Sequence, residues 1–228
     1  GDRMHLRTKM LIIILCLTAI PLLSSMYFAH HLLDKLDDEF QESTRNTVSM
    51  LINNSRTLLK QNAAAIIHEK AHSVAKQAEI YIKAYNKTLE ELQRDPEFES
   101  IAVQPVGETG YTALTEYPVG ICRFHKKGEI VNQNLHTLAS KLPEFWRIMV
   151  KSLTGAESYG FYTWKEPDTG RLREKYMHIT PINATTADGK RMNVAATAYV
   201  DEFYQQIDQL ERDSQIQLKN LMTKMDKT

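Results

Sequence analysis

The feature that most constrains the fold is a long stretch, residues 22–95, that contains neither glycine nor proline. The stretch is rich in Leu, Ala, Lys, Glu and Gln, which favour helix, and Pro96 follows it. Its apolar residues recur at spacings of three and four, as in Ala78, Ile82, Tyr85, Leu89 and Leu92. We therefore predict one long helix over 34–95, whose apolar stripe must pack against the rest of the chain or against a second copy.

An uncharged apolar segment, residues 10–28, precedes this stretch and would span about 28 Å as a helix. Arg3, Arg7 and Lys9 stand before it and acidic residues follow it, which favours a cytoplasmic N-terminus. We predict a cytoplasmic segment over 1–9, a single transmembrane helix over 10–28 and an extracytoplasmic remainder, held at the cell membrane. A cleaved signal peptide is the alternative.

Charge and cysteine content exclude several other classes of protein. The 28 basic and 28 acidic residues cancel, so nothing indicates a nucleic-acid partner. The two cysteines are Cys16, inside the apolar segment, and Cys122, so neither a disulfide framework nor a thiolate metal site is expected.

After Pro96 the helical period gives way to short β-branched and aromatic runs separated by Gly and Pro. We predict an α+β domain over 96–200, with a helix over 143–153 and a C-terminal amphipathic helix over 201–228. The expected fold is a five-stranded antiparallel sheet packed on the long helix. The expected strands are 110–116, 120–125, 158–165, 174–181 and 191–200.

The ordered motifs of this domain resemble those of the Cache family of extracytoplasmic sensor domains, which have a PAS-like sheet behind a long helix. They are GETGYT at 107–112, YTWKEP at 162–167, Lys175-Tyr176, and ATAYVDEF at 196–203. The resemblance implies the sensor portion of a prokaryotic receptor of the histidine kinase or chemoreceptor type. It also implies a homodimer through the long helix, signalling by helix rearrangement, and an effector outside this chain, so no enzyme activity is expected.

Strand alternation places cationic and aromatic side chains together on the sheet. Such a face suits a small anionic ligand, because Arg pairs with carboxylates while Tyr and Trp pack a carbon skeleton. We predict a metabolite site, with an organic acid favoured and no cofactor. The alternative is that the aromatic residues are core and the cations face water. The predicted ligand-binding residues are Arg123, His125, Tyr162, Trp164, Tyr176 and His178.

One motif points to a different chemistry. His68-Glu69-x-x-His72 matches the zinc-peptidase pattern, in which two histidines one helical turn apart bind the metal. A catalytic zinc needs a third protein ligand, and the acidic residues farther along the same helix, Glu90 and Glu91, lie too far away. We therefore predict no metal site. A zinc-dependent membrane-anchored hydrolase and a non-signalling structural ectodomain stay open as alternative functions.

Overall fold

The computed structural model describes residues 2–166, 169–203, 212 and 216, and the chain divides into two compact units, 1–53 and 54–228. The described residues of the first unit are all helical and belong to α1 (Asp2–Tyr85). Large apolar side chains on this part of α1, such as Leu33, Leu36 and Phe40, are exposed. No helix among the described residues combines the length and the hydropathy of a membrane span. The anchor expected over 10–28 stays a prediction.

The long helix ends at Tyr85 rather than at Asp95. Asn86 follows in the left-handed region, with φ of 45°, and short-chain Asn tolerates this conformation better than most residues. Thr88 then begins α2 (Leu89–Gln93) with a capping box, in which the Thr88 side chain and Glu91 cap each other's backbone N–H groups. Local capping thus interrupts a stretch whose composition alone predicts an unbroken helix. A third helix, α3 (Pro96–Ala102), leads into the sheet.

The sheet is antiparallel throughout and contains six strands. The strand order is β1-β2-β6-β5-β4, and β3 pairs with the free part of β2. The predicted α+β class and the antiparallel sheet on the long helix are confirmed, with a two-residue strand added at the start. The strands are β1 (Pro105–Val106), β2 (Gly110–Tyr117), β3 (Ile121–Phe124), β4 (Ser158–Lys165), β5 (Leu172–Thr185) and β6 (Arg191–Tyr199).

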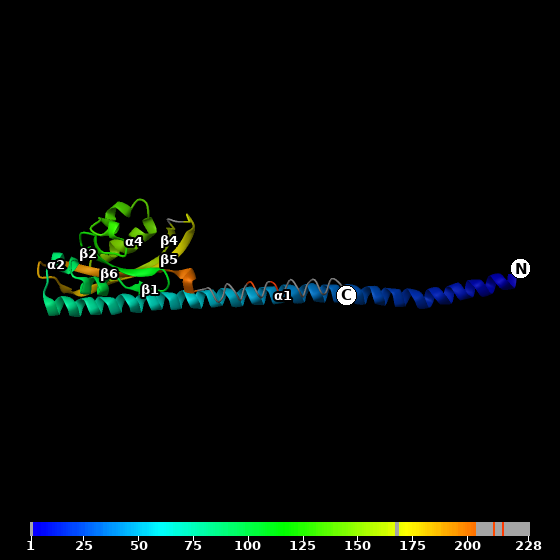
Figure 1. Ribbon diagram of the computed structural model, residues 1–228. Coiled ribbons are helices and arrows are strands. Elements are labelled where there is room, and N and C mark those ends of the chain that lie inside the picture. Colours follow the sequence, from blue (N-terminus) through cyan, green and yellow to red (C-terminus); the bar gives the residue numbers. More distant parts are fainter. Residues whose placement is uncertain (1, 167–168, 204–211, 213–215, 217–228) are drawn as a thin grey trace. The chain divides into compact units, whose positions relative to one another are not determined.

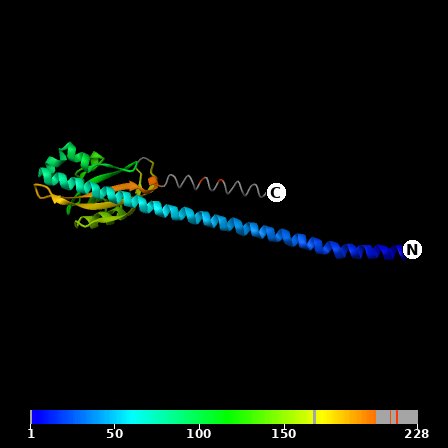
Figure 2. The ribbon, with the colours of Figure 1, turned by 90° about the horizontal axis from the view of Figure 1, so that it is seen from below.

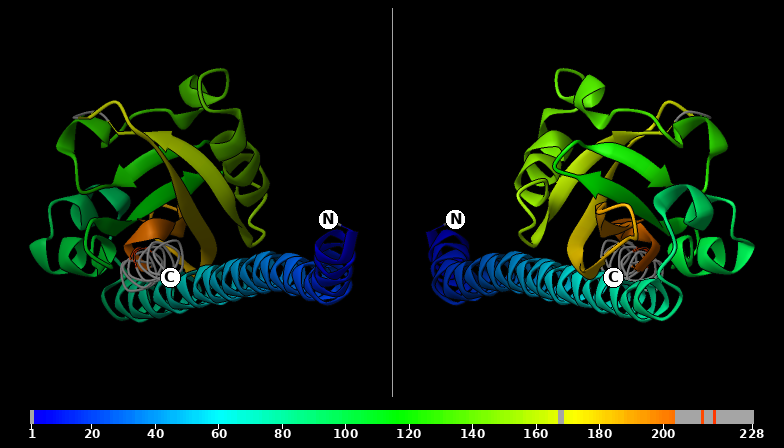
Figure 3. Two further views of the ribbon diagram at one scale, coloured as in Figure 1. Left: turned by 90° about the vertical axis from the view of Figure 1, so that its right-hand side faces the viewer. Right: turned by 90° about the vertical axis from the view of Figure 1, so that its left-hand side faces the viewer.

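Within the second unit, the two faces of the sheet are covered by different elements. Residues 54–85 of α1 run along one face, and α4 (Pro143–Ser152) lies on the other side (Figures 1, 2 and 3). On the α1 side, Val74 and Ala78 pack with Leu114 and Val194. The α4 side has its own cluster, which includes Ile148, Met149, Tyr162, Met177 and Ile179.

Strand β6 shows how alternation separates these two faces. Val194, Ala196 and Ala198 pack in the clusters on the α1 side, as their small apolar pattern predicts. Their neighbours Ala195, Thr197 and Tyr199 face the opposite side. After β6 comes a short 3-10 helix, η3 (Val200–Phe203). The C-terminal helix predicted from 201 onward lies almost wholly outside the described residues.

Candidate functional site

A cavity of about 500 Å³ lies on the face of the sheet opposite α1. Strands β2, β4, β5 and β6 contribute its floor, while α4 and the segment between β3 and α4 contribute its cover. Its volume falls within the range of small-molecule sites, and apolar groups make up much of the wall. The apolar lining residues include Ile130, Leu135, Leu138, Phe145, Met149, Met177 and Ala195.

The most unusual group in this cavity is the ammonium of Lys175 on β5. The residue is only 5% exposed, and burial lowers its pKa to about 8. Its Nζ lies 4.7 Å from the ring centre of Tyr199, 5.3 Å from that of Tyr111 and 5.6 Å from that of Trp164. In the described part of the chain, no hydrogen bond or ion pair reaches this Nζ. Lys175 is therefore a desolvated cation held by aromatic faces. No carboxylate of the described residues contacts it directly, and that of Glu202 acts on it only at longer range.

The hydroxyl of Tyr111, a second polar group of this cavity, can donate its proton to a ligand. The backbone N–H of Lys127 donates to Nδ1 of His125 at 2.9 Å, so Nδ1 carries no proton. Burial lowers the pKa of His125, which favours the neutral ring with its proton on Nε2. That Nε2 donates to the Tyr111 hydroxyl at 3.1 Å. Since burial raises the pKa of Tyr111 to about 12, its O–H stays protonated and is available to a ligand.

The hydroxyl of Tyr162, unlike that of Tyr111, has no proton available for a ligand. Thr197 Oγ1 donates to the carbonyl of Tyr176 at 2.9 Å, so the Thr197 proton is already used. Tyr162 then donates to Thr197 Oγ1, also at 2.9 Å. Burial raises the pKa of Tyr162, which keeps the phenol neutral. The Tyr162 hydroxyl can only accept a further hydrogen bond. It therefore lines the cavity but cannot donate to a bound anion.

Arg173, a partly buried cation of the lining, is paired with two carboxylates. Its Nε donates to Asp201 at 2.8 Å, and the guanidinium also binds Glu166. Asp201 belongs to η3, immediately after β6. A second link to η3 runs through Glu202, which accepts from the backbone N–H of Thr109, another lining residue, at 3.3 Å. Two residue pairs, Arg173–Asp201 and Thr109–Glu202, therefore join the cavity wall to η3.

Three of the six ligand-binding residues predicted from sequence line the cavity: His125, Tyr162 and Trp164. Arg123 lies at the sheet edge, where its Nε donates to Glu116 at 2.8 Å. β3 ends at Phe124 and its pairing with β2 shifts register, so alternation does not carry from Arg123 to His125.

Tyr176 and His178 share one face of β5, as alternation predicts, but it is the face toward α1. Tyr176 packs there with Ile67 and Ala71. The sequence pattern did not predict Lys175 and Tyr111, two lining residues with a donor available to a ligand. A signal was present, because Lys175 shares the parity of Met177 and Ile179, two apolar residues of the same strand.

Comparisons with known proteins give only distant likenesses. No protein-family profile and no curated protein sequence matches the chain. Among solved structures, a periplasmic sensor domain of a chemotaxis protein is 16% identical, with a TM-score of 0.43, covering 62% of this chain and 95% of its own. A methyl-accepting chemotaxis protein from Vibrio parahaemolyticus is 13% identical, with a TM-score of 0.43, covering 65% and 99%.

A third solved structure is a Cache chemosensory domain described for carboxylic acid recognition. It is 12% identical, with a TM-score of 0.34, covering 68% of this chain and 98% of its own. One of these three solved structures is thus a Cache domain, the family that the sequence motifs resemble, and the other two are chemotaxis proteins. No ligand, activity or partner follows from likenesses of this strength.

Proposed function

We propose that this chain is the extracytoplasmic sensing portion of a transmembrane receptor and that its cavity binds a small organic acid. The observation that carries the proposal is Lys175, a buried ammonium that faces the cavity without a carboxylate partner in the described residues. A ligand carboxylate would supply the missing charge in a site already shielded from water. A carboxylate beside Nζ would also raise the pKa of Lys175 from its depressed value.

The rest of the lining supports a short carbon skeleton with one acidic end. The Tyr111 hydroxyl can donate a second hydrogen bond to the same carboxylate, because its own oxygen already accepts from His125. Trp164, Met177 and Phe145 provide apolar and aromatic surface for the remaining carbons. An open cavity of about 500 Å³ also speaks against a structural ectodomain whose core is filled by side chains.

Signal transmission in this proposal begins at η3. Arg173 and Thr109 line the cavity and bind Asp201 and Glu202, respectively. A ligand that shifts either lining residue changes the position of η3 relative to the sheet. The ligand can drive such a change only to the extent that it binds the two arrangements with different affinity. Helix rearrangement and a dimer through α1 belong to the same proposal.

The test is a calorimetric screen of the purified 228-residue chain with small carboxylic acids, each paired with its neutral amide. We expect at least one acid to bind while its amide does not, and Lys175→Met to reduce that affinity by roughly tenfold to a hundredfold. Lys151→Met is the matched control, because Lys151 is exposed on α4 and does not line the cavity. If acids bind equally well to Lys175→Met, the assigned site is wrong, and if no acid in a broad screen binds, the sensor proposal fails.

A further inference from the structure

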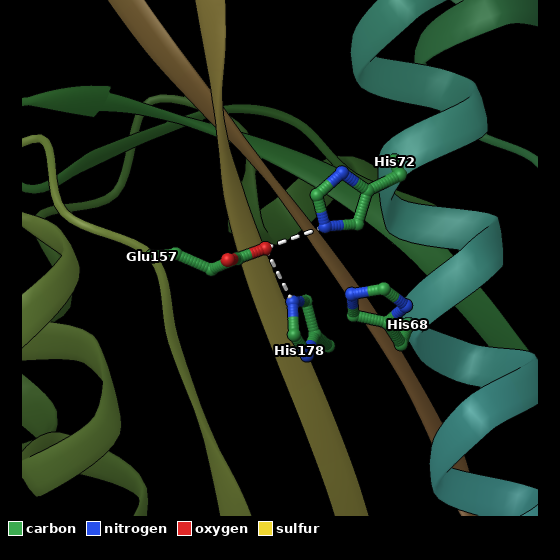
Figure 4. A group of neighbouring side chains, drawn as sticks. All are labelled: His68, His72, Glu157 and His178. Carbon is green, nitrogen blue, oxygen red and sulfur yellow. Dashed lines mark hydrogen bonds and ion pairs between the residues drawn. The ribbon is translucent and has the colours of Figure 1, made fainter.

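Four side chains that can ligate metals meet on the other face of the sheet, between α1 and β5 (Figure 4). They are His68, His72, Glu157 and His178, and one ligand atom from each lies within 4.8 Å of every other. The rings of His68 and His178 are 4.5 Å apart between centres, and those of His68 and His72 are 4.3 Å apart. Glu157 lies among them with its carboxylate directed at two of the rings.

Local structure explains why these residues converge. His68 and His72 are four residues apart on α1, so they project from the same face of the helix toward the sheet. His178 points toward α1 because it shares the parity of Tyr176 on β5. Glu157 comes just before β4, whose first residue Ser158 pairs with Ile179 on β5. Three segments that are distant in sequence are thus brought to one point by the pairing of β4 with β5 and the packing of α1.

The contacts within the cluster leave nitrogen atoms without a satisfactory partner. Nε2 of His72 and Nε2 of His178 lie 2.5 and 2.7 Å from the same oxygen, Oε1 of Glu157. The His72 contact is not aligned as a hydrogen bond, although the two atoms are this close. His178 is 3% exposed, and its Nδ1 has no hydrogen-bond partner among the described residues. Protein atoms alone therefore satisfy this polar cluster poorly.

The surroundings of Glu157 also suit a metal ligand. Its carboxylate is the acidic member of the set. Thr180 orients this carboxylate, because its hydroxyl donates a hydrogen bond to Oε1 of Glu157 at 3.1 Å.

We propose that His68, His72, Glu157 and His178 form a binding site for one divalent transition metal ion, with zinc the best fit to three imidazoles and a carboxylate. Ligand atoms around tetrahedral zinc lie about 3.4 Å apart, since each bond is about 2.1 Å long. The observed atoms, within 4.8 Å of one another, would reach this spacing by shifts of roughly an ångström. The inference is independent of the proposed organic-acid cavity.

A site with four protein ligands is closed, and this decides what the metal would do. Catalytic zinc keeps an open position for water, whereas structural zinc is surrounded by protein ligands. Glu69, the base in the peptidase pattern, has a side chain that is 79% exposed and contacts His68 at 3.3 Å instead. The metal would therefore fasten α1 to β5 rather than catalyse hydrolysis. The third and fourth ligands lie outside the helix that carries the His68 and His72 pair, so the spacing along that helix does not reveal the site.

The test is a zinc titration of the tag-free, chelator-stripped full chain, followed by calorimetry and by competition with a chromogenic chelator. We expect one tight zinc ion per chain and a rise in melting temperature on binding. Glu157→Gln and His72→Gln should each weaken binding at least tenfold. These two side chains are about 40% exposed, so both variants are expected to fold. Cobalt should give the visible absorption of a four-coordinate ion in the starting chain and lose it in either variant.

The matched control is His136→Gln, which removes a histidine that contacts Trp146 of α4, on the opposite face of the sheet from the cluster. Zinc binding should be unchanged in this variant, as should organic-acid binding in the two ligand variants. Far-UV circular dichroism verifies that each variant is folded. The proposal is overturned if the stripped chain binds no zinc with stoichiometry one, or if Glu157→Gln and His72→Gln bind it as tightly as His136→Gln does.

Discussion

Replacing Lys175 with methionine should make the protein more stable and at the same time less able to bind an anion. Methionine has a similar length and an apolar stem, but it places no charge in the buried site. The pKa of Lys175 falls from its ordinary 10.5 to about 8 in the folded chain. At about 1.36 kcal/mol for each pKa unit, the buried charge costs about 3 kcal/mol near pH 7. The substitution removes this cost, but it also removes the cation–aromatic contacts, which offsets about 1 kcal/mol of the gain in stability.

The pH dependence gives the sharper test. The pKa of Lys175 is lower in the folded chain than in the unfolded chain. The free-energy cost of burying its charge is therefore fully present below pH 8 and disappears as the pH rises toward 10.5. The stability difference between Lys175→Met and the starting chain should therefore shrink by about half between pH 7 and about pH 9.5. Urea unfolding of both proteins, followed by circular dichroism, measures this difference. Other groups that titrate in this range cancel in the comparison.

The result that would refute the reasoning is a Lys175→Met protein that is less stable than the starting chain at pH 7. A stability difference that does not change with pH would equally show that Lys175 is not held as a desolvated cation. Lys151→Met, which alters an exposed lysine, should change stability by no more than about 0.5 kcal/mol at either pH.

Three further outcomes are expected. Tyr111→Phe should weaken binding of the organic acid about tenfold in calorimetry, because it removes the free donor beside Lys175, and unchanged affinity would exclude Tyr111 from the site. Thr88→Ala should cost about 1 kcal/mol in urea unfolding by removing the capping box, and no loss would mean that the cap does not stabilise the start of α2. If α1 mediates a dimer, Leu36→Asp with Phe40→Asp should halve the mass measured by sedimentation equilibrium, since both side chains are exposed apolar groups, and an unchanged dimer would place the interface elsewhere.

Sequence periodicity predicted the elements well because each depends on neighbours along the chain. The strands, the helix begun by Pro143 and the two faces of β6 are all set by local pattern. The end of α1 was placed too late because a capping box at Thr88 overrides composition. Local pattern does not predict which face of β5 packs on α1. Alternation places Tyr176 and His178 on one face of the strand but does not indicate which element covers that face.

The candidate sites were harder to predict for the same physical reason. Lys175 matters because of what surrounds it, and the rings around its ammonium come from three other strands. The partners of the His68 and His72 pair lie roughly a hundred residues away, at Glu157 and His178. The pairing of β4 with β5 and the packing of α1 on the sheet bring them together, and no spacing rule along one helix detects such a set.

Strand β5 carries the two candidate sites on consecutive residues, since Lys175 and Met177 face the cavity while Tyr176 and His178 face α1. A single inserted or deleted residue upstream in this strand would turn the ammonium toward the histidines and a histidine toward the ligand. Both chemistries would be lost in one step. This strand can therefore diverge by substitution but not by change of length, and in any relative that keeps both sites the residues from Arg173 to Ile179 should align without a gap.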